Sequence, residues 1–246
     1  MGIPPFHWWR TVFFLIPAIS LYTIVLGTLS IGSSLFEKRG YFAHWCARMW
    51  SRLILRTTGV DVDVDGLERL VPGRTYVFVS NHQSIYDIPI LFWSLPFQLR
   101  IIAKESLGRF PFLGWHLRRT GHMLVNRARP DRAIFAWASA LTSKGLSLIV
   151  FPEGTRSPDG RVGVFKGGSF HLALEAGLPI VPLSVVGSRH VMLKGRLATY
   201  PGRVRLVVHE PIDTSALVGS DPKAFGERVR QIIAPDAESD AVGSRQ

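Results

Sequence analysis

The sequence predicts an α/β protein in which helices flank a mixed, largely parallel sheet, with membrane-associated helices ahead of the sheet. Two observations predict this fold. From Gly59 onward, short apolar or β-branched segments alternate with segments of helical periodicity, and such alternation is typical of a mainly parallel sheet. Before that point, the 26 residues Thr11–Phe36 carry no charge, which is typical of a membrane-associated helix.

The uncharged N-terminal segment is long enough to cross a membrane. A helix of this length would extend about 39 Å, against a hydrocarbon core of about 30 Å. Its most apolar part, Val12–Leu26, is shorter and contains Pro17. A tilted span and a helix embedded in one leaflet both remain open. Trp8 and Trp9 precede it, where interfacial anchors belong.

Residues 41–57 predict an amphipathic helix. Two stripes share a four-residue spacing, one basic and one apolar: Arg48, Arg52 and Arg56, and Trp45, Met49 and Leu53. This pattern is typical of a helix that lies on an anionic bilayer; the alternative is a helix packed on the next domain. Because the basic residues follow the apolar segment, the positive-inside bias predicts that the remainder faces the cytoplasm. We expect residues 1–57 to form the membrane anchor.

The strands and helices of the predicted catalytic domain, 58–234, are bounded by Gly, Pro or Asn. The strands are expected at Val60–Val64, Thr75–Val79, Leu99–Ala103, His122–Val125, Leu146–Phe151, Ile180–Val186 and Val204–Val208, and the helices at Ile85–Ser94, Arg129–Ser143, Ser169–Ala176 and Pro222–Ile233. The polar residues 235–246 are expected to form a disordered tail.

Charge and composition narrow the class of partner. A net charge of +11 attracts anions, whether nucleic acid, anionic lipid or an acidic carrier protein. Nucleic-acid binding leaves the apolar N-terminus unexplained, so we expect no nucleic-acid partner. The single cysteine, Cys46, excludes an internal disulfide, and the histidines are scattered along the chain. We therefore expect neither a metal site nor a bound cofactor.

The first motif with chemical meaning follows the strand predicted at 75–79. It reads Asn-His-Gln-Ser-Ile-Tyr-Asp and runs from Asn81 to Asp87. A histidine in the loop at the end of a strand is well placed to act as a general base. If the next helix begins near Ser84, Asp87 lies in its first turn and points back at His82, fixing the tautomer of the imidazole. The alternative is a capping box formed by Ser84 and Asp87.

The second motif, Phe-Pro-Glu-Gly-Thr-Arg-Ser, follows the strand predicted at 146–151. The turn through Gly154 and Thr155 places Arg156 at its rim, and a guanidinium binds phosphate through two parallel hydrogen bonds. Glu153 is assigned to a substrate hydroxyl or to orienting Arg156. Lys166 follows, with two glycines that open a helix, and free N–H groups at a helix start suit an anion. The alternative is a surface turn with a solvated arginine.

Together with Arg127 at a strand end and Val181-Pro182 in a later strand, these motifs resemble the glycerolipid acyltransferase family. The resemblance covers about Gly59–Val208, and Glu-Gly-Thr-Arg is similar to the 1-acylglycerol-3-phosphate branch. Asn126 stands where many relatives carry aspartate.

The resemblance implies that the protein moves a fatty acyl chain from acyl-coenzyme A or acyl-carrier protein to the sn-2 hydroxyl of 1-acylglycerol-3-phosphate, giving phosphatidic acid. His82 and Asp87 would be catalytic. The phosphate would be held by Arg156, Arg127, Lys166 and Lys104, and the substrate positioned by Glu153, Gly154, Thr155 and Asn81.

The implied location is the cytoplasmic face of a bacterial inner membrane. No Gly-x-Ser-x-Gly sequence occurs, which favours direct transfer over an acyl-enzyme. Two alternatives stay open: transfer to another lyso-lipid, such as one derived from an amino acid, and a non-catalytic lipid-binding protein of the same fold.

Overall fold

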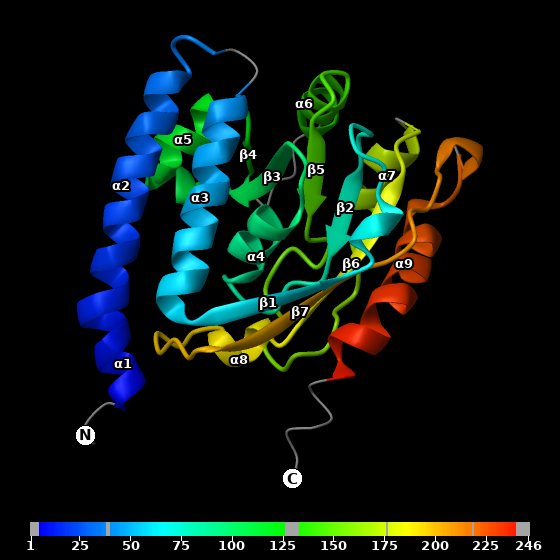
Figure 1. Ribbon diagram of the computed structural model, residues 1–246. Coiled ribbons are helices and arrows are strands. Elements are labelled where there is room, and N and C mark those ends of the chain that lie inside the picture. Colours follow the sequence, from blue (N-terminus) through cyan, green and yellow to red (C-terminus); the bar gives the residue numbers. More distant parts are fainter. Residues whose placement is uncertain (1–4, 38–39, 126–132, 176, 218, 240–246) are drawn as a thin grey trace.

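One mixed sheet between two layers of helices makes up most of the computed structural model (Figure 1). The structure describes residues 5–37, 40–125, 133–175, 177–217 and 219–239. The strands are β1 (Val60–Asp65), β2 (Val77–Ser80), β3 (Leu99–Lys104), β4 (Met123–Val125), β5 (Ser147–Val150), β6 (Ile180–Val186) and β7 (Gly202–Val208). The helices are α1 (Phe6–Arg10), α2 (Ile16–Ser33), α3 (Tyr41–Thr58), α4 (Asp87–Ser94), α5 (Leu113–Arg119), α6 (Ala133–Thr142), α7 (Gly168–Glu175), α8 (Ser188–Val191) and α9 (Pro222–Ala237).

The strand order of the sheet is β1-β7-β6-β2-β5-β3-β4. Every neighbouring pair is parallel except β6 and β7, which are antiparallel. The predicted mixed, largely parallel sheet is therefore confirmed. Because β2 and β5 are direct parallel neighbours, the loops that follow them emerge side by side at one edge of the sheet.

Each face of the sheet carries its own hydrophobic core. Side chains alternate along β2 and the residue before it, so Tyr76 and Phe78 enter one core while Val77 and Val79 enter the other. The first core also receives side chains from α3 and α4, and the second receives side chains from α6, α7 and α9. β2 is thus packed on both faces, which fixes the position of the strand end from which the next loop begins.

The N-terminal helix runs from Phe6 to Ser33 and is the one helix in the described part of the chain that is long and apolar enough to cross a membrane. Its hydrogen-bond pattern changes from α-helical to π-helical at Thr11–Leu15, just before Pro17. Proline cannot donate to the helical ladder, and such a change is a common accommodation of that defect. Pro17 therefore does not end the helix.

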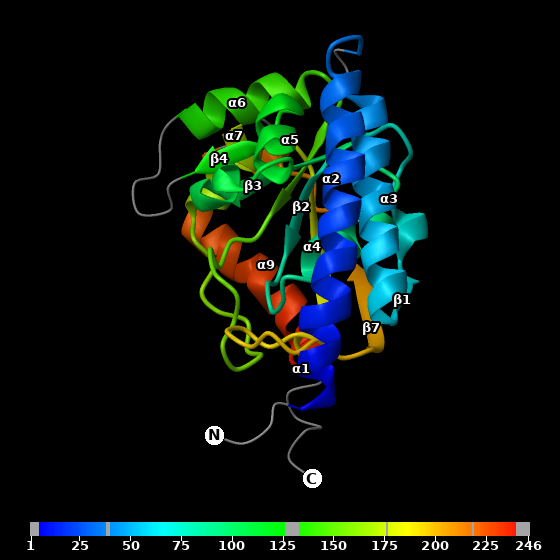
Figure 2. The same cartoon turned by 90° about the vertical axis from the view of Figure 1, so that its left-hand side faces the viewer.

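The predicted amphipathic helix is α3, and it packs on the domain. It lies antiparallel beside α2 and also packs against α4 (Figures 1 and 2). Its Ile54 and Leu55 belong to the first core. The guanidiniums of Arg48 and Arg52 lie 5.5 and 5.2 Å from the ring centre of Trp93 in α4.

Two of the three arginines of the basic stripe therefore contact α4, as the alternative of a helix packed on the next domain expects, while Arg56 is exposed. The expected boundary at residue 57 does not separate two cores, because α3 shares its core with the sheet. On the exposed face, Trp45 is 47% and Phe42 43% accessible.

The C-terminal helix is longer than expected. α9 continues through Pro235 to Ala237, which is 1% exposed and accepts a hydrogen bond at its carbonyl from the Gln83 side chain, at 3.0 Å. The next residue, Glu238, accepts a hydrogen bond from the backbone of Val162. These tertiary contacts hold the last turn, so the expected tail does not begin at residue 235. Residues 240–246 lie outside the described residues.

Candidate active site

The two sequence motifs meet at the carboxyl ends of β2 and β5. His82 comes two residues after β2, and Glu153 to Arg156 form the turn after β5. Lys104 is the last residue of β3, which pairs with β5 on its other side. Arg127, which follows β4, lies outside the described residues. Loops at the carboxyl ends of parallel strands are where active sites gather in this type of fold.

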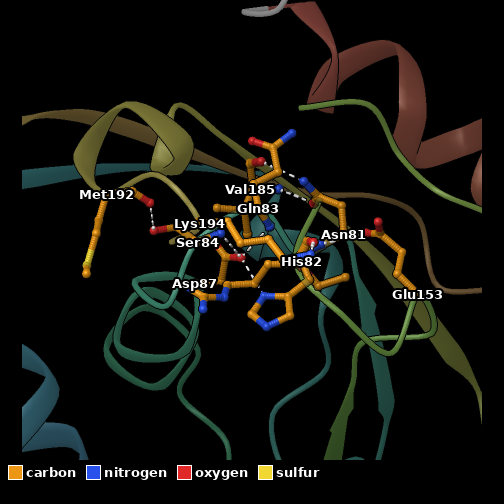
Figure 3. A network of polar contacts seen from close by, with 11 residues as sticks. Asn81, His82, Gln83, Ser84, Asp87, Glu153, Val185, Met192 and Lys194 are labelled. Atoms are coloured by element: carbon orange, nitrogen blue, oxygen red, sulfur yellow. Dashed lines mark hydrogen bonds and ion pairs between the residues drawn. The ribbon is translucent and has the colours of Figure 1, made fainter. Parts of the chain in front are cut away.

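His82 and Asp87 form the predicted pair. The Nδ1 atom of His82 is 2.8 Å from Oδ2 of Asp87, which lies at the first position of α4 and points back at the loop (Figure 3). The same Oδ2 accepts hydrogen bonds from the backbone N–H groups of Gln83, at 2.8 Å, and Ser84, at 2.9 Å. The Ser84 hydroxyl bonds instead to the carbonyl of Met192, so only half of the capping box forms. One carboxylate oxygen therefore serves both the helix start and the imidazole.

The arrangement assigns the ring nitrogens of His82. An ionised carboxylate only accepts hydrogen bonds, so Nδ1 carries the proton and Nε2 presents its lone pair. The ring is stacked on Phe151, with centroids 4.2 Å apart, and His82 is 7% exposed. The basic nitrogen is held in one orientation, which is what a general base requires.

The turn after β5 holds the backbone of His82 on both sides. Glu153 accepts a hydrogen bond at Oε1 from the N–H of His82, at 2.8 Å, and the N–H of Ser157 donates to the carbonyl of His82, at 2.7 Å. The second oxygen of Glu153 accepts from Gly163 at 3.1 Å. Burial raises the pKa of Glu153, and these two hydrogen bonds oppose the rise.

This set of contacts corrects the role expected for Glu153. Its carboxylate is 9% exposed and bonded to the backbone of two loops, so it positions His82 rather than Arg156 or a substrate hydroxyl. Asn81 also differs from the expectation. It is fully buried, and its amide exchanges two hydrogen bonds with the backbone of Val185 in β6, at 2.9 and 2.8 Å. Asn81 thereby extends the pairing of β2 with β6, and it does not line the cleft described below.

A cleft of about 400 Å³ lies in front of His82. Arg156 and Lys104 line it, together with Gly154 and Thr155. Its apolar wall consists of Ile85, Ile88, Ile101, Ile102, Ala103, Leu107 and Phe151. A cleft lined by both cations and aliphatic side chains suits a molecule with an anionic head and an apolar tail.

Lys166 lies at the back of the turn and does not line the cleft. Gly154 has a φ of +71°, and a Cβ built on it would lie 3.0 Å from the Lys166 ammonium. Glycine is therefore favoured here by the left-handed backbone conformation, which other residues rarely adopt. The expected phosphate-binding set is brought together only in part, with Arg156 and Lys104 at the cleft.

Lys194 also lines the cleft, and the sequence did not predict it as a site residue. Lys194 lies in the segment between α8 and β7, and its ammonium donates to the carbonyl of Arg156 at 2.6 Å and to the hydroxyl of Thr155 at 3.2 Å. No motif surrounds Lys194 in the sequence. It is near His82 only because β6 is the direct neighbour of β2.

Other candidate nucleophiles and metal ligands lie away from this geometry. Cys46 is buried in α3, and burial raises the pKa of its thiol to about 11. Within the described ranges, no group of three or more His, Cys, Asp or Glu side chains is arranged to hold a metal ion.

The fold and the site together define a group-transfer enzyme site, with an oriented base beside a cleft for an anionic, partly apolar molecule. The family model described as Acyltransferase matches residues 61–186. The chain belongs to the acyltransferase family.

Several proteins are similar over most of the chain. The chloroplastic 1-acyl-sn-glycerol-3-phosphate acyltransferase BAT2 of Brassica napus is 36% identical over 72% of this chain and 53% of its own length. The alpha form of the mouse enzyme is 35% identical over 70% of this chain and 62% of its own length. The chain thus spans between about half and two thirds of these curated relatives.

A solved structure is similar over nearly the whole chain. The crystal structure of the 1-acyl-sn-glycerophosphate (LPA) acyltransferase PlsC from Thermotoga maritima matches with a TM-score of 0.75 and 30% identity, over 93% of this chain and 96% of that one.

Proposed function

We propose that this protein transfers a fatty acyl chain from an acyl thioester to the free sn-2 hydroxyl of 1-acylglycerol-3-phosphate, giving phosphatidic acid. One observation carries the proposal: His82, oriented by Asp87, lines the same cleft as Arg156 and the aliphatic wall. The similar proteins of known name are acyltransferases of this lyso-lipid, which supports the choice of acceptor.

The reaction follows from the orientation of His82. Nε2 takes the proton of the acceptor hydroxyl while the hydroxyl oxygen attacks the thioester carbonyl. The C–S bond then breaks, and the departing thiolate takes the proton back from the imidazolium. Asp87 stabilises the imidazolium between these steps, and a base of this kind contributes about 10²–10⁴-fold to the rate.

The remaining groups of the cleft fit the substrates. Arg156 would hold the phosphate of the acceptor through two parallel hydrogen bonds, with Lys104 as a second cation. The aliphatic wall would receive an acyl chain. The donor would be acyl-coenzyme A or acyl-carrier protein, used as a co-substrate, and no bound cofactor or metal takes part. Direct transfer is preferred to an acyl-enzyme because the one thiol, Cys46, is buried with a raised pKa.

The N-terminal helix would attach the protein to an anionic membrane. Its outer face exposes Phe13, Leu21 and Val25, at 68%, 58% and 48%. Its inner face is bonded to the domain at both ends: Arg10 donates to the carbonyl of Thr58 at 3.0 Å, and Ser30 pairs with His116 at 2.7 Å.

Because the domain lies against the whole helix, a helix embedded from one side fits this packing better than one that crosses the bilayer alone. The positive charge that follows the helix supports placement at the cytoplasmic face of a bacterial inner membrane.

The test is a transfer assay with the full chain purified in detergent. Labelled palmitoyl-coenzyme A and palmitoyl-carrier protein are each offered with lysophosphatidic acid, an amino-acid-derived lyso-lipid and a phosphate-free monoacylglycerol. We expect transfer to lysophosphatidic acid and its loss in His82→Ala. Transfer only to another acceptor would replace the substrate, and acceptor binding without any transfer would support the non-catalytic alternative.

A further inference from the structure

Lys194 is a cation of the cleft that the proposed mechanism leaves without a role. It belongs to the segment 192–201 between α8 and β7, which we call the β7 approach loop. Its ammonium has three N–H donors. The carbonyl of Arg156 and the hydroxyl of Thr155 accept two of them, at 2.6 and 3.2 Å. Among the residues that the structure describes, Thr155 and Arg156 are the acceptors of Lys194, which leaves its third donor for a ligand.

The charge of Lys194 is not needed to balance an acidic side chain. Over the described residues, no carboxylate forms an ion pair with Lys194, with Arg156 or with Lys104. The two carboxylates that contact His82 already have hydrogen-bond partners. Asp87 accepts from the His82 ring and from two backbone N–H groups. Glu153 accepts from backbone N–H groups of two loops. The three cations therefore leave the cleft with a surplus of positive charge that an anionic ligand would neutralise.

The β7 approach loop is held at both ends, so Lys194 has a defined place. At its start, the carbonyl of Met192 accepts the hydroxyl of Ser84, in the loop that carries His82 (Figure 3). Near its end, the N–H of Thr199 donates to the hydroxyl of Thr11 at 3.0 Å, and the ring of Tyr200 contacts that of His7 at a tilt of 46°, with centroids 4.5 Å apart. The loop is thus bonded at one end to the segment that carries His82 and at the other to the N-terminal helix, and Lys194 lies between these two contacts in the sequence.

We propose that Lys194 binds the phosphate of the acceptor together with Arg156. This inference rests on the proposed function, and it assigns a residue in the β7 approach loop to recognition of the headgroup. Nζ of Lys194 is bonded to the main-chain carbonyl of Arg156, and both residues line the same cleft, so a phosphate bound there can contact both cations. The loop is also bonded to the apolar helix, so the headgroup site stands beside the membrane surface from which a lyso-lipid would enter.

The test compares Lys194→Met and Lys194→Arg with the matched control Arg196→Met, a neighbour in the same loop that is exposed and does not line the cleft. We expect Lys194→Met to raise the KM for lysophosphatidic acid by about 10-fold, the lower end for a charge-assisted hydrogen bond because Lys194 is exposed. The donor KM and the rate with monoacylglycerol should not change, and Lys194→Arg should recover most of the affinity. The control should behave as the unaltered protein.

Binding is measured separately with a lysophosphatidic acid analogue that lacks the sn-2 hydroxyl, by calorimetry in detergent. The analogue should bind about 10-fold more weakly to Lys194→Met. If the unaltered protein binds the analogue but transfers nothing, and Lys194→Met binds it about 10-fold more weakly, the proposed function fails while the role of Lys194 in binding is upheld. If transfer is normal and Lys194→Met binds the analogue as tightly as Arg196→Met does, the inference about Lys194 is wrong and the proposed function survives. Equal loss of turnover with both acceptors, with a lower melting temperature, would also overturn it by showing that Lys194 only holds the turn.

Discussion

The backbone N–H of His82 donates a hydrogen bond to the carboxylate of Glu153, although the two residues are 71 positions apart. Glu153 thus fixes the base through its main chain, while Asp87 fixes it through its ring. In Glu153→Gln, one oxygen remains to accept from His82, but the amide nitrogen meets the N–H of Gly163. We expect a loss of about 1–3 kcal/mol of stability, the usual cost of an unsatisfied buried group.

Turnover of Glu153→Gln should fall as well, with little change in either KM, because the displaced group is the base and not a substrate contact. Denaturation in detergent and steady-state kinetics check the two effects. The exposed Glu175→Gln is the matched control. If Glu153→Gln is destabilised but its turnover is unchanged, Glu153 contributes to stability and does not position His82 for catalysis.

Asp87→Asn separates the dyad from the helix start. The asparagine oxygen can still accept from the backbone of Gln83 and Ser84, but its amide would face Nδ1 of His82 and favour the wrong tautomer. We expect turnover to fall by about 10²–10⁴-fold, while the melting temperature drops only modestly. Normal turnover in a strongly destabilised variant would instead favour the capping role alone.

Arg156→Lys tests how the acceptor is recognised. Lysine keeps the charge but cannot form two parallel hydrogen bonds, so the KM for lysophosphatidic acid should rise by about 10–150-fold, corresponding to about 1.5–3 kcal/mol. The donor KM and the response to monoacylglycerol should stay nearly constant. A rise confined to the donor KM would move Arg156 to the thioester.

The site could be predicted from the sequence wherever a local motif carries it. The spacing of His82 and Asp87 and the turn through Arg156 are encoded within a few residues, so their geometry was expected. The roles of Glu153 and Asn81 depend on which strands become neighbours, because Glu153 bonds to His82 and Asn81 to Val185, each more than 70 residues away. Lys194 was missed for the same reason, since only the β2–β6 pairing brings its loop to the site.

In the fold, the alternation of strands and helices predicted the sheet correctly, because burial imposes the pattern on the residues themselves. The pattern of basic and apolar residues in α3 did not determine whether the helix contacts a membrane or another helix. An apolar stripe beside arginines suits a bilayer and also suits a neighbouring helix that presents a tryptophan, as α4 does with Trp93.

The stability of the protein should depend on pH through histidines buried around Arg100. Burial, followed by the charge of Arg100, lowers the pKa of His44 to about 3 and of His116 to about 4, and the same causes lower that of His122. Below pH 6.5 the unfolded chain gains protons that the folded one does not. The free energy of unfolding should therefore fall with decreasing pH, by up to about 1.4 kcal/mol per pH unit for each histidine.

The measurement is denaturation in detergent between pH 7 and pH 5. His44→Leu should reduce the slope of the free energy of unfolding against pH by the contribution of one histidine. The control His190→Leu makes the same substitution at an exposed histidine and should leave this slope unaltered. An equal slope in all three proteins would mean that His44 is protonated in the folded state.

Membrane attachment can be tested with two matched substitutions of exposed valines. Val25 lies on the outer face of α2 and is 48% exposed, and Val71 lies in the loop before β2 and is 55% exposed. A charged residue at the centre of a membrane helix costs about 2.5–3.5 kcal/mol, so Val25→Asp should weaken binding to anionic vesicles by up to about 100-fold. Val71→Asp should bind normally. Equal binding by both variants, measured by vesicle flotation, would place α2 outside the hydrocarbon.

The hydrogen bond between Thr11 and Thr199 spans 188 positions, and this has a consequence for biosynthesis. The ribosome delivers the apolar helix long before its partners in α5 and in the β7 approach loop exist. During that interval the bilayer is the one available environment for its outer face. The nascent chain would then reach the membrane first, and the enzyme would complete its folding on a helix already in place.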